Sequence, residues 1–235
     1  MDEPLPLILF SGMGADHSIF AHQIKSFPQL TVPKWIKPLP RESLADYAKR
    51  FAAQIDPARP CFVGGASFGG FIALEAARHL QTRACFLIGS VRCPSELPMR
   101  FRVMRKLKQL LPFLPFEWLS PLAECSVRLS GERMHPATRK IMEQLEKSDA
   151  THLRWACAAV LTWQPSCSAP PFPIYQIHGK HDRVLPARRT HPDKLIPTGG
   201  HVLSLTRPQE VNRFLAEKMN TRTLHESEVA TATTI

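Results

Sequence analysis

The sequence predicts an α/β protein in which a mostly parallel sheet is flanked by helices. Short apolar segments alternate with amphipathic segments of helical spacing, which is typical of a parallel sheet. The alternation stops near residue 90 and resumes near residue 170, and the segment between them is helical in pattern and punctuated by proline. We therefore expect a core made of residues 1–90 and 170–220, a helical lid inserted at 91–169, and a flexible tail at 221–235.

The first elements are predicted from short patterns. The apolar run at 7–10 is a strand that leads into the glycine turn "SGMGAD". Asp16 can cap the helix that follows, which we expect to end near Phe27. The segment "LTVPKWI" offers a second, poorer strand, since proline interrupts it.

The next helix has the clearest pattern. Within "SLADYAKRFAAQI" the apolar residues share one helical face, and Ser43 and Asp46 form a capping-box pattern at its start. Further elements follow in alternation. They are a strand at 61–66, a helix at 71–80, a strand at 84–88, lid helices at 97–111, 139–147 and 152–163, strands at 174–177 and 194–196, and a helix at 208–219 that starts on Pro208.

Composition and charge restrict the classes of function. The chain has 235 residues, of which 44% are hydrophobic and 21% charged, as expected for one globular domain. No apolar run is long enough to span a bilayer, and the acidic first residues do not read as a secretory signal. The 6 cysteines show neither a C-x-x-C pair nor a zinc-like spacing with histidine, so we expect reduced thiols, no metal and a cytoplasmic location.

The net charge of +10 is the unusual feature of the composition. Such a balance is compatible with nucleic acid, an anionic membrane surface or an acidic protein as partner. The chain has no zinc-finger spacing, no aromatic RNA-binding signature and no basic arm, so we expect no nucleic acid partner.

The segment "GGASFGG" contains the candidate nucleophile. Residues 65–69 match G-x-S-x-G, and Ser67 falls between a predicted strand and a predicted helix, which is the context this motif requires. Small flanking residues allow a strained turn from which the serine Oγ projects, and the helix start adds N–H donors nearby. The alternative reading is an ordinary turn residue.

A serine hydroxyl needs a base, and the base needs an orienting carboxylate. Asp182 follows a predicted strand in "IYQIHGKHDRVLP", and His201 follows the next strand in "LIPTGGHVLSLTRP". The loops after parallel strands meet at one sheet edge, so these side chains can converge on Ser67. Asp182 could instead cap its own turn, with Glu96 as the rival carboxylate, and His201 could be structural.

These motifs together resemble the α/β-hydrolase fold family over nearly the whole core. The matching features are the serine turn, "HGKHDRVLP" and the Gly-Gly-His before the last helix. The resemblance implies Ser67 as nucleophile, His201 as general base and then acid, and Asp182 as the carboxylate that orients it. It also implies an oxyanion hole from the backbone N–H groups of Met13 and Phe68.

The chain departs from the family pattern in three places. Ser11-Gly12 replaces the usual His-Gly before the oxyanion residue. The first two strands of the family are absent, because Leu7 already belongs to the strand before the oxyanion loop. The short segment between Asp182 and His201 leaves room only for a turn near residues 186–189 in place of a helix.

The lid sequence "LPMRFRVMRKLKQLLPFLPFEWL" has an apolar face and a basic face. From the apolar residues, Met104, Leu107, Phe113 and Trp118 are candidates for the substrate pocket, although such residues at helical spacing more often serve ordinary packing. The basic face has three interpretations: a solvated surface, a peripheral membrane contact, or a docking face for an acidic carrier protein.

We therefore predict a serine hydrolase that needs no cofactor and cleaves a small-molecule carboxylic ester or thioester through an acyl-enzyme. The chain is also similar to carboxylesterases that release methyl esters from acyl chains on acyl carrier protein, an acidic partner. Two alternatives stay open. One is a lyase or C–C bond hydrolase on the same residues, aided by Arg92, Arg102 or His152 from the lid. The other is a binding or receptor-like protein of low turnover.

Overall fold

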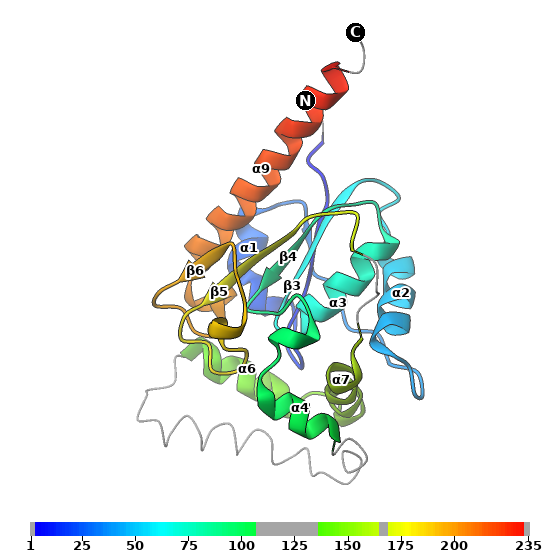
Figure 1. The fold of residues 1–235 in the computed structure, drawn as a ribbon, viewed down its shortest axis with the longest axis vertical. Coiled ribbons are helices and arrows are strands. Elements are labelled where there is room, and N and C mark those ends of the chain that lie inside the picture. The colour runs from blue at the N-terminus through cyan, green and yellow to red at the C-terminus, as the bar shows by residue number, and fades with distance from the viewer. Residues whose placement is uncertain (1–2, 107–135, 165–168, 233–235) are drawn as a thin grey trace.

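The computed structural model describes residues 3–106, 136–164 and 169–232. Its centre is a six-stranded sheet with the order β2-β1-β3-β4-β5-β6 (Figure 1). The strands are β1 Leu7–Phe10, β2 Leu30–Thr31, β3 Cys61–Ala66, β4 Thr82–Ile88, β5 Ile174–Gly179 and β6 Lys194–Ile196. Every pairing between them is parallel, so the predicted α/β class is confirmed. The described residues contain no antiparallel strand before β1, as the sequence predicted.

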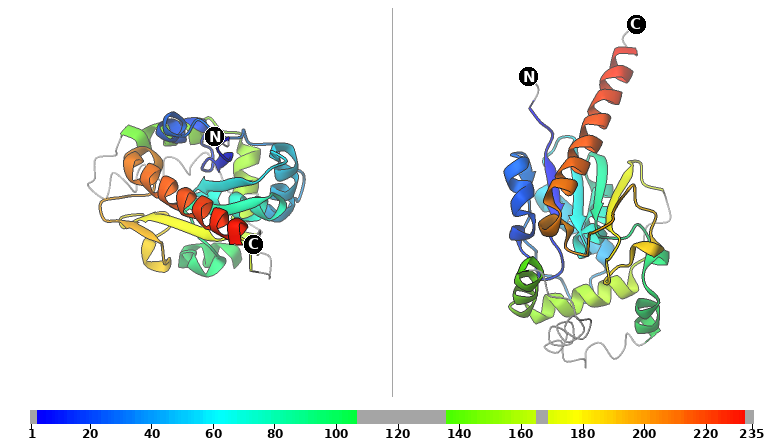
Figure 2. Two further views of the ribbon diagram at one scale, coloured as in Figure 1. Left: turned by 90° about the horizontal axis from the view of Figure 1, so that it is seen from above. Right: turned by 90° about the vertical axis from the view of Figure 1, so that its left-hand side faces the viewer.

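Helices cover both faces of the sheet (Figure 2). They are α1 Ala21–Ser26, α2 Leu44–Ile55, α3 Phe68–Ala76, α4 Met99–Lys106, α6 Pro136–Glu146, α7 Ala150–Thr162, α8 Leu203–Thr206 and α9 Pro208–Ala232. One apolar core lies between the sheet and helices α2, α3 and α7, and a second lies between the sheet and helices α1 and α9. Because both faces are covered, β1 and β3 consist entirely of buried residues.

Two predicted helix starts are confirmed by their side-chain caps. The Ser43 hydroxyl accepts a hydrogen bond from the N–H of Asp46 at 3.1 Å, which satisfies an N–H that the first turn of α2 leaves free. Asp16 accepts from the N–H of Ser18 at 2.8 Å and caps the 3-10 turn that leads into α1.

Helix α3 begins at Phe68, earlier than the predicted residue 71. Gly69 and Gly70 weaken the helical signal in the sequence, because glycine disfavours a helix interior. Both are instead needed for packing: a Cβ on Gly69 would collide with the carbonyl of Phe10, and a Cβ on Gly70 with the Ser90 hydroxyl. Close approach of α3 to the sheet therefore sets the start of the helix.

Helix α9 is longer than the helix that the sequence predicts at 208–219. It continues to Ala232 and so takes in most of the segment that we expected to be a flexible tail. No glycine or proline follows Pro208, so the two strongest helix-ending residues are absent from residues 209–232.

Helices α4, α6 and α7 belong to the segment predicted as a lid, and they lie at the sheet edge where the strands end (Figure 1). Helix α7 packs its buried face onto α2 and α3. Among the described residues, no helix is long and apolar enough to cross a membrane.

Candidate active site

Ser67 sits in a strained turn between β3 and α3. Its backbone has φ +51° and ψ −119°, a combination that non-glycine residues rarely adopt. The turn is closed by steric contact, since a Cβ on Gly65 would collide with the backbone of Gly69. The N–H of Ser67 donates to the carbonyl of Ile88 at 3.0 Å, which anchors the turn to β4. The Oγ therefore projects beyond the sheet edge rather than into the core.

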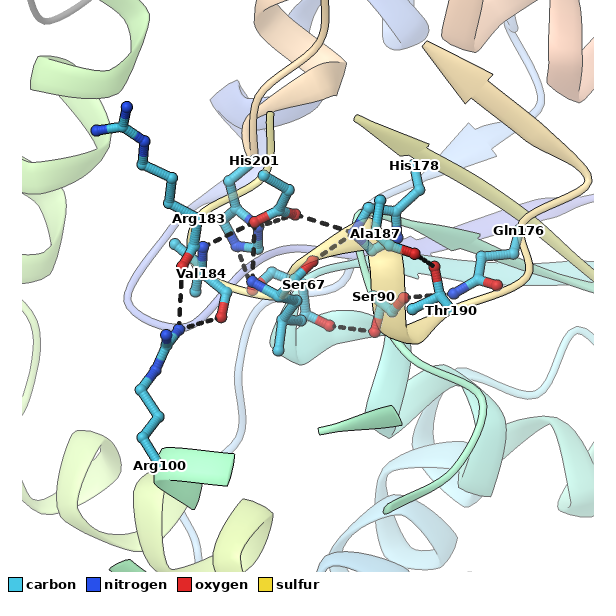
Figure 3. Close-up of polar contacts among 12 residues, drawn as sticks. Ser67, Ser90, Arg100, Gln176, His178, Arg183, Val184, Ala187, Thr190 and His201 are labelled. Atoms are coloured by element: carbon cyan, nitrogen blue, oxygen red, sulfur yellow. Dashed lines mark hydrogen bonds and ion pairs between the residues drawn. The ribbon is translucent and has the colours of Figure 1, made fainter. Parts of the chain in front are cut away.

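The three residues selected from the sequence lie in hydrogen-bond contact, and Figure 3 shows His201 beside Ser67. His201 Nε2 is 2.9 Å from Ser67 Oγ, and His201 Nδ1 is 2.7 Å from Asp182 Oδ2. The Asp182 carboxylate is buried, whereas the His201 side chain keeps 19% exposure. The imidazole therefore lies between a buried acceptor and a hydroxyl at the surface of the site.

Asp182 is held by contacts to both carboxylate oxygens. Oδ1 accepts from the N–H groups of Val184 and Leu185, each at 2.8 Å. Oδ2 lies 3.1 Å from His178 Nε2 as well as near His201. Burial by itself would raise the pKa of Asp182, but His201, His178 and the Leu185 N–H outweigh burial and lower that pKa. Asp182 thus stays ionised and directs its charge to His201.

Close backbone packing brings the His201 loop to Asp182. A Cβ on Gly179, at the end of β5, would collide with the carbonyls of Gly199 and Gly200. A Cβ on Gly200 would meet nothing within 4 Å. A Cβ on Gly199 would collide with the Leu203 side chain and press on Gly179. Gly179 and Gly199 therefore have to lack a side chain for the two loops to approach, whereas Gly200 does not.

The predicted oxyanion donors come from two elements. Phe68 opens α3, where the N–H groups of the first turn have no partner within the helix. Met13 lies in the turn after β1, which is closed by a 3.0 Å hydrogen bond from the Ala15 N–H to the Gly12 carbonyl. The Met13 thioether lies 3.8 Å from the Cys157 thiol of α7, so the lid contacts this turn.

Sequence reasoning missed Ser90 and Gln176. The Ser90 hydroxyl donates to the Ser67 carbonyl at 2.8 Å, and Gln176 Nε2 donates to the Ser90 carbonyl at 2.7 Å (Figure 3). Both are buried and connect the strained turn to β4 and β5. The available signal was a polar residue in or close to an apolar strand run: Gln176 lies within β5, and Ser90 follows β4 after Gly89.

Comparison with known families assigns the chain. Residues 8–214 match the model of the family described as "Alpha/beta hydrolase family". The chain belongs to the alpha/beta hydrolase family. It is therefore an enzyme of hydrolase type, and the predicted fold is confirmed. No curated protein matches the sequence of this hydrolase.

Solved structures share the fold of the hydrolase at low sequence identity. A thermophilic esterase from Thermogutta terrifontis is 17% identical with a TM-score of 0.69, and the match covers 93% of this chain and 90% of the esterase. An epoxide hydrolase from Bacillus megaterium is 12% identical with a TM-score of 0.70, covering 93% and 94%. An enol-lactonase from Burkholderia xenovorans is 13% identical with a TM-score of 0.68, covering 93% and 92%. These likenesses concern the fold alone.

A cleft of about 920 Å³ opens beside the loop that follows β1 in this hydrolase. It is lined by the loop itself, by residues 32–38 and by the adjoining parts of α6 and α7, but not by Ser67 or His201. Trp35 in its wall lies 5.5 Å, between ring centroids, from Phe68, the neighbour of the nucleophile candidate. Trp35 therefore packs between this cleft and Phe68.

His152 of α7 also lines this cleft and is 8% exposed. Its ring lies 5.4 Å from Trp35 and 5.6 Å from Trp155, and burial among these rings lowers the pKa of His152. In the described part of the hydrolase, His152 Nε2 has no hydrogen-bond partner. His152 thus contributes a neutral ring to the cleft wall and does not contact the triad.

The remaining lid predictions have different outcomes. Met104 is 37% exposed on α4 and lines neither this cleft nor the smaller hollow beside residues 180–188. Leu107, Phe113 and Trp118 lie outside the described residues, as does the Arg102 side chain. Arg92, which we considered as a polar group reaching the pocket from the lid, is engaged elsewhere. It pairs with Asp193 at 2.6 Å and donates to the His191 carbonyl.

Proposed function

We propose that this hydrolase cleaves a carboxylic ester or thioester through an acyl-enzyme on Ser67. The observation that supports this function is the unbroken hydrogen-bond chain from Ser67 Oγ through His201 to the buried Asp182 carboxylate. A hydroxyl in contact with a base, with that base oriented by a carboxylate, is the arrangement that nucleophilic acyl transfer needs.

The reaction follows from these positions. Ser67 Oγ attacks the carbonyl carbon while His201 Nε2 takes its proton, and the charge on the carbonyl oxygen is stabilised by the N–H groups of Phe68 and Met13. The tetrahedral intermediate then expels the alcohol or thiol, which receives that proton from His201. Water attacks the acyl-enzyme in the same manner, so the acid leaves and Ser67 recovers its proton.

The cleft beside the oxyanion loop supports a substrate with an extended apolar part. Its wall includes Val32, Trp35 and Ile36, and Trp35 also contacts Phe68. Ligand sites are commonly concavities of several hundred Å³ with apolar walls. This cleft has a comparable volume and apolar wall residues, together with charged ones such as Lys34, Lys37 and Asp149. We expect the acyl or alcohol portion of the ester to occupy it, carried as a small molecule or on an acidic carrier protein.

Labelling with a fluorophosphonate followed by intact-mass measurement tests the nucleophile directly. We expect one adduct on the wild type, none on Ser67→Ala, and an unchanged adduct on Ser26→Ala, whose hydroxyl is exposed on α1. Turnover of p-nitrophenyl esters and thioesters of increasing chain length should fall by roughly 10⁴-fold or more in Ser67→Ala. A folded wild type that forms no adduct would exclude the proposed function.

A further inference from the structure

Helix α4 and residues 180–188 form one continuous surface, here called the α4 surface. The Arg100 guanidinium of α4 donates to the carbonyl groups of Arg183 and Val184 and so fixes the helix against the loop that carries Asp182 (Figure 3). A hollow of about 380 Å³ lies at this junction, between Arg100 and residues 180–188. The surface is therefore a defined part of the fold rather than a set of unrelated side chains.

Positive charge dominates the α4 surface. Its exposed cationic side chains are Arg100, Arg105, Lys106, Lys180, Arg183 and Arg188. The acidic side chain of the surface, Asp182, is 4% exposed and is already used by His201, His178 and backbone N–H groups. Nearby Glu96 accepts from the N–H of Arg92. The exposed cations named above outnumber these two carboxylates, so the α4 surface keeps an excess of positive charge facing solvent.

Apolar side chains are exposed on the same surface. Met99, Val103, Met104 and Val184 are 58%, 53%, 37% and 45% exposed. Elsewhere in the described residues, the large hydrophobic side chains with comparable exposure are Ile24, Leu39 and Leu195. In the described residues, most of the strongly exposed large hydrophobic side chains therefore lie on the same surface as the cations. Such a concentration indicates an interaction site.

We propose that the α4 surface binds the surface of an anionic phospholipid membrane. The cation-lined hollow suits a phosphate headgroup, and the flanking methionine and valine side chains suit the apolar layer just below the headgroups. A protein partner would instead favour aromatic anchors at the centre of the contact, whereas the most exposed hydrophobic side chains of the α4 surface are methionine and valine. The complementary charge and the aliphatic character together favour lipid over an acidic protein.

This contact would place the triad at the membrane. Asp182 lines the hollow from the inside, and the α4 surface lies at the sheet edge from which Ser67 projects. Membrane binding itself does not depend on the proposed ester cleavage, so the two proposals can fail separately.

Co-sedimentation of the full chain with vesicles tests the proposal. We expect binding to phosphatidylcholine vesicles that contain a quarter phosphatidylglycerol, little binding to phosphatidylcholine alone, and a loss of binding as salt screens the charges. Each cation near an anionic surface contributes about fivefold in affinity, so replacing Arg100, Lys180 and Arg188 together by glutamine should weaken binding by about 100-fold.

A matched triple variant separates the surface from the net charge. Replacing Lys25, Lys49 and Arg213 by glutamine removes the same charge from α1, α2 and α9, and should change affinity by less than about threefold if the proposal holds. Met99→Ser with Met104→Ser should weaken binding by about tenfold at unchanged salt dependence. Thermal unfolding checks that every variant is folded.

Three outcomes would overturn the proposal. They are equal binding to both vesicle compositions, equal losses in the two charge variants, and binding of an acidic acyl carrier protein to the α4 surface in the absence of any vesicle binding.

Discussion

The Ser67 turn and the Asp182 loop lie at the same sheet edge but are held by opposite means. At Ser67 the backbone is forced to φ +51°, and the flanking Gly65 and Gly69 leave no room for even one added methyl group. At Asp182 both carboxylate oxygens are fixed by hydrogen bonds. The nucleophile candidate is thus positioned by steric contact, and its acidic partner by polar contact.

This difference indicates how each half of the site should fail. A steric arrangement tolerates no added atom and fails by losing the fold around it. A site held by hydrogen bonds stays folded when one side chain is replaced by another of equal size. It loses its function when a donor replaces an acceptor, because the direction of the hydrogen bond and the local charge then change.

The largest effect is expected on the polar side. Asp182→Asn keeps the side-chain volume but presents an N–H where His201 Nδ1 needs an acceptor, so the imidazole adopts the wrong tautomer. The second-order rate of fluorophosphonate labelling should fall by roughly 10⁴-fold while the protein stays folded. A rate within tenfold of the wild type would show that Asp182 does not orient His201.

A substitution in the closely packed Ser67 turn should lower the stability of the protein. In Gly69→Ala the added Cβ collides with the carbonyls of Phe10 and Ser11, so we expect the free energy of unfolding to drop by about 4 kcal/mol or more. Gly200→Ala is the matched control, because nothing lies within 4 Å of its added Cβ. Urea unfolding should place the control within about 0.5 kcal/mol of the wild type, or slightly above it. Equal losses would contradict a steric origin.

A smaller effect is expected in the pH dependence of stability, which depends on the charge of Asp182. The pKa of Asp182 is lowered in the folded state, so its contribution to stability is complete above about pH 5 and is lost as pH falls through the low folded pKa. Between about pH 5 and pH 3 the free energy of unfolding should therefore decrease more steeply for the wild type than for Asp182→Asn. Denaturant melts across this range measure both slopes, and parallel slopes would exclude the charge of Asp182 as their cause.

The sequence predicted the sheet, and the contact among Ser67, His201 and Asp182, because each depends on local pattern. The motif around Ser67 and the apolar runs before Asp182 and His201 define where strands end, and parallel strands end at one edge. Convergence of those side chains then follows from topology.

The supporting contacts could not be predicted in the same way. Whether Trp35 meets Phe68, or Ser90 meets the Ser67 carbonyl, depends on how loops and strands far apart in sequence pack together. Met104 illustrates the limit for the lid, since helical spacing identified an apolar residue but not that its side chain is exposed. The continuation of α9 agrees with the absence of glycine and proline after Pro208, but the polar composition of these residues suggested a tail instead of a helix.

The connection between β4 and β5 has a consequence for how this architecture can change. These paired strands are joined by residues 89–173, which include α4, α6 and α7. The entropy of closing a chain loop grows only with the logarithm of its length, so this long excursion costs roughly 2 kcal/mol more than a link of about ten residues. Lengthening or replacing it is therefore inexpensive for the sheet. New specificities can be acquired by exchanging the insert while the strand register and the reacting groups stay as they are.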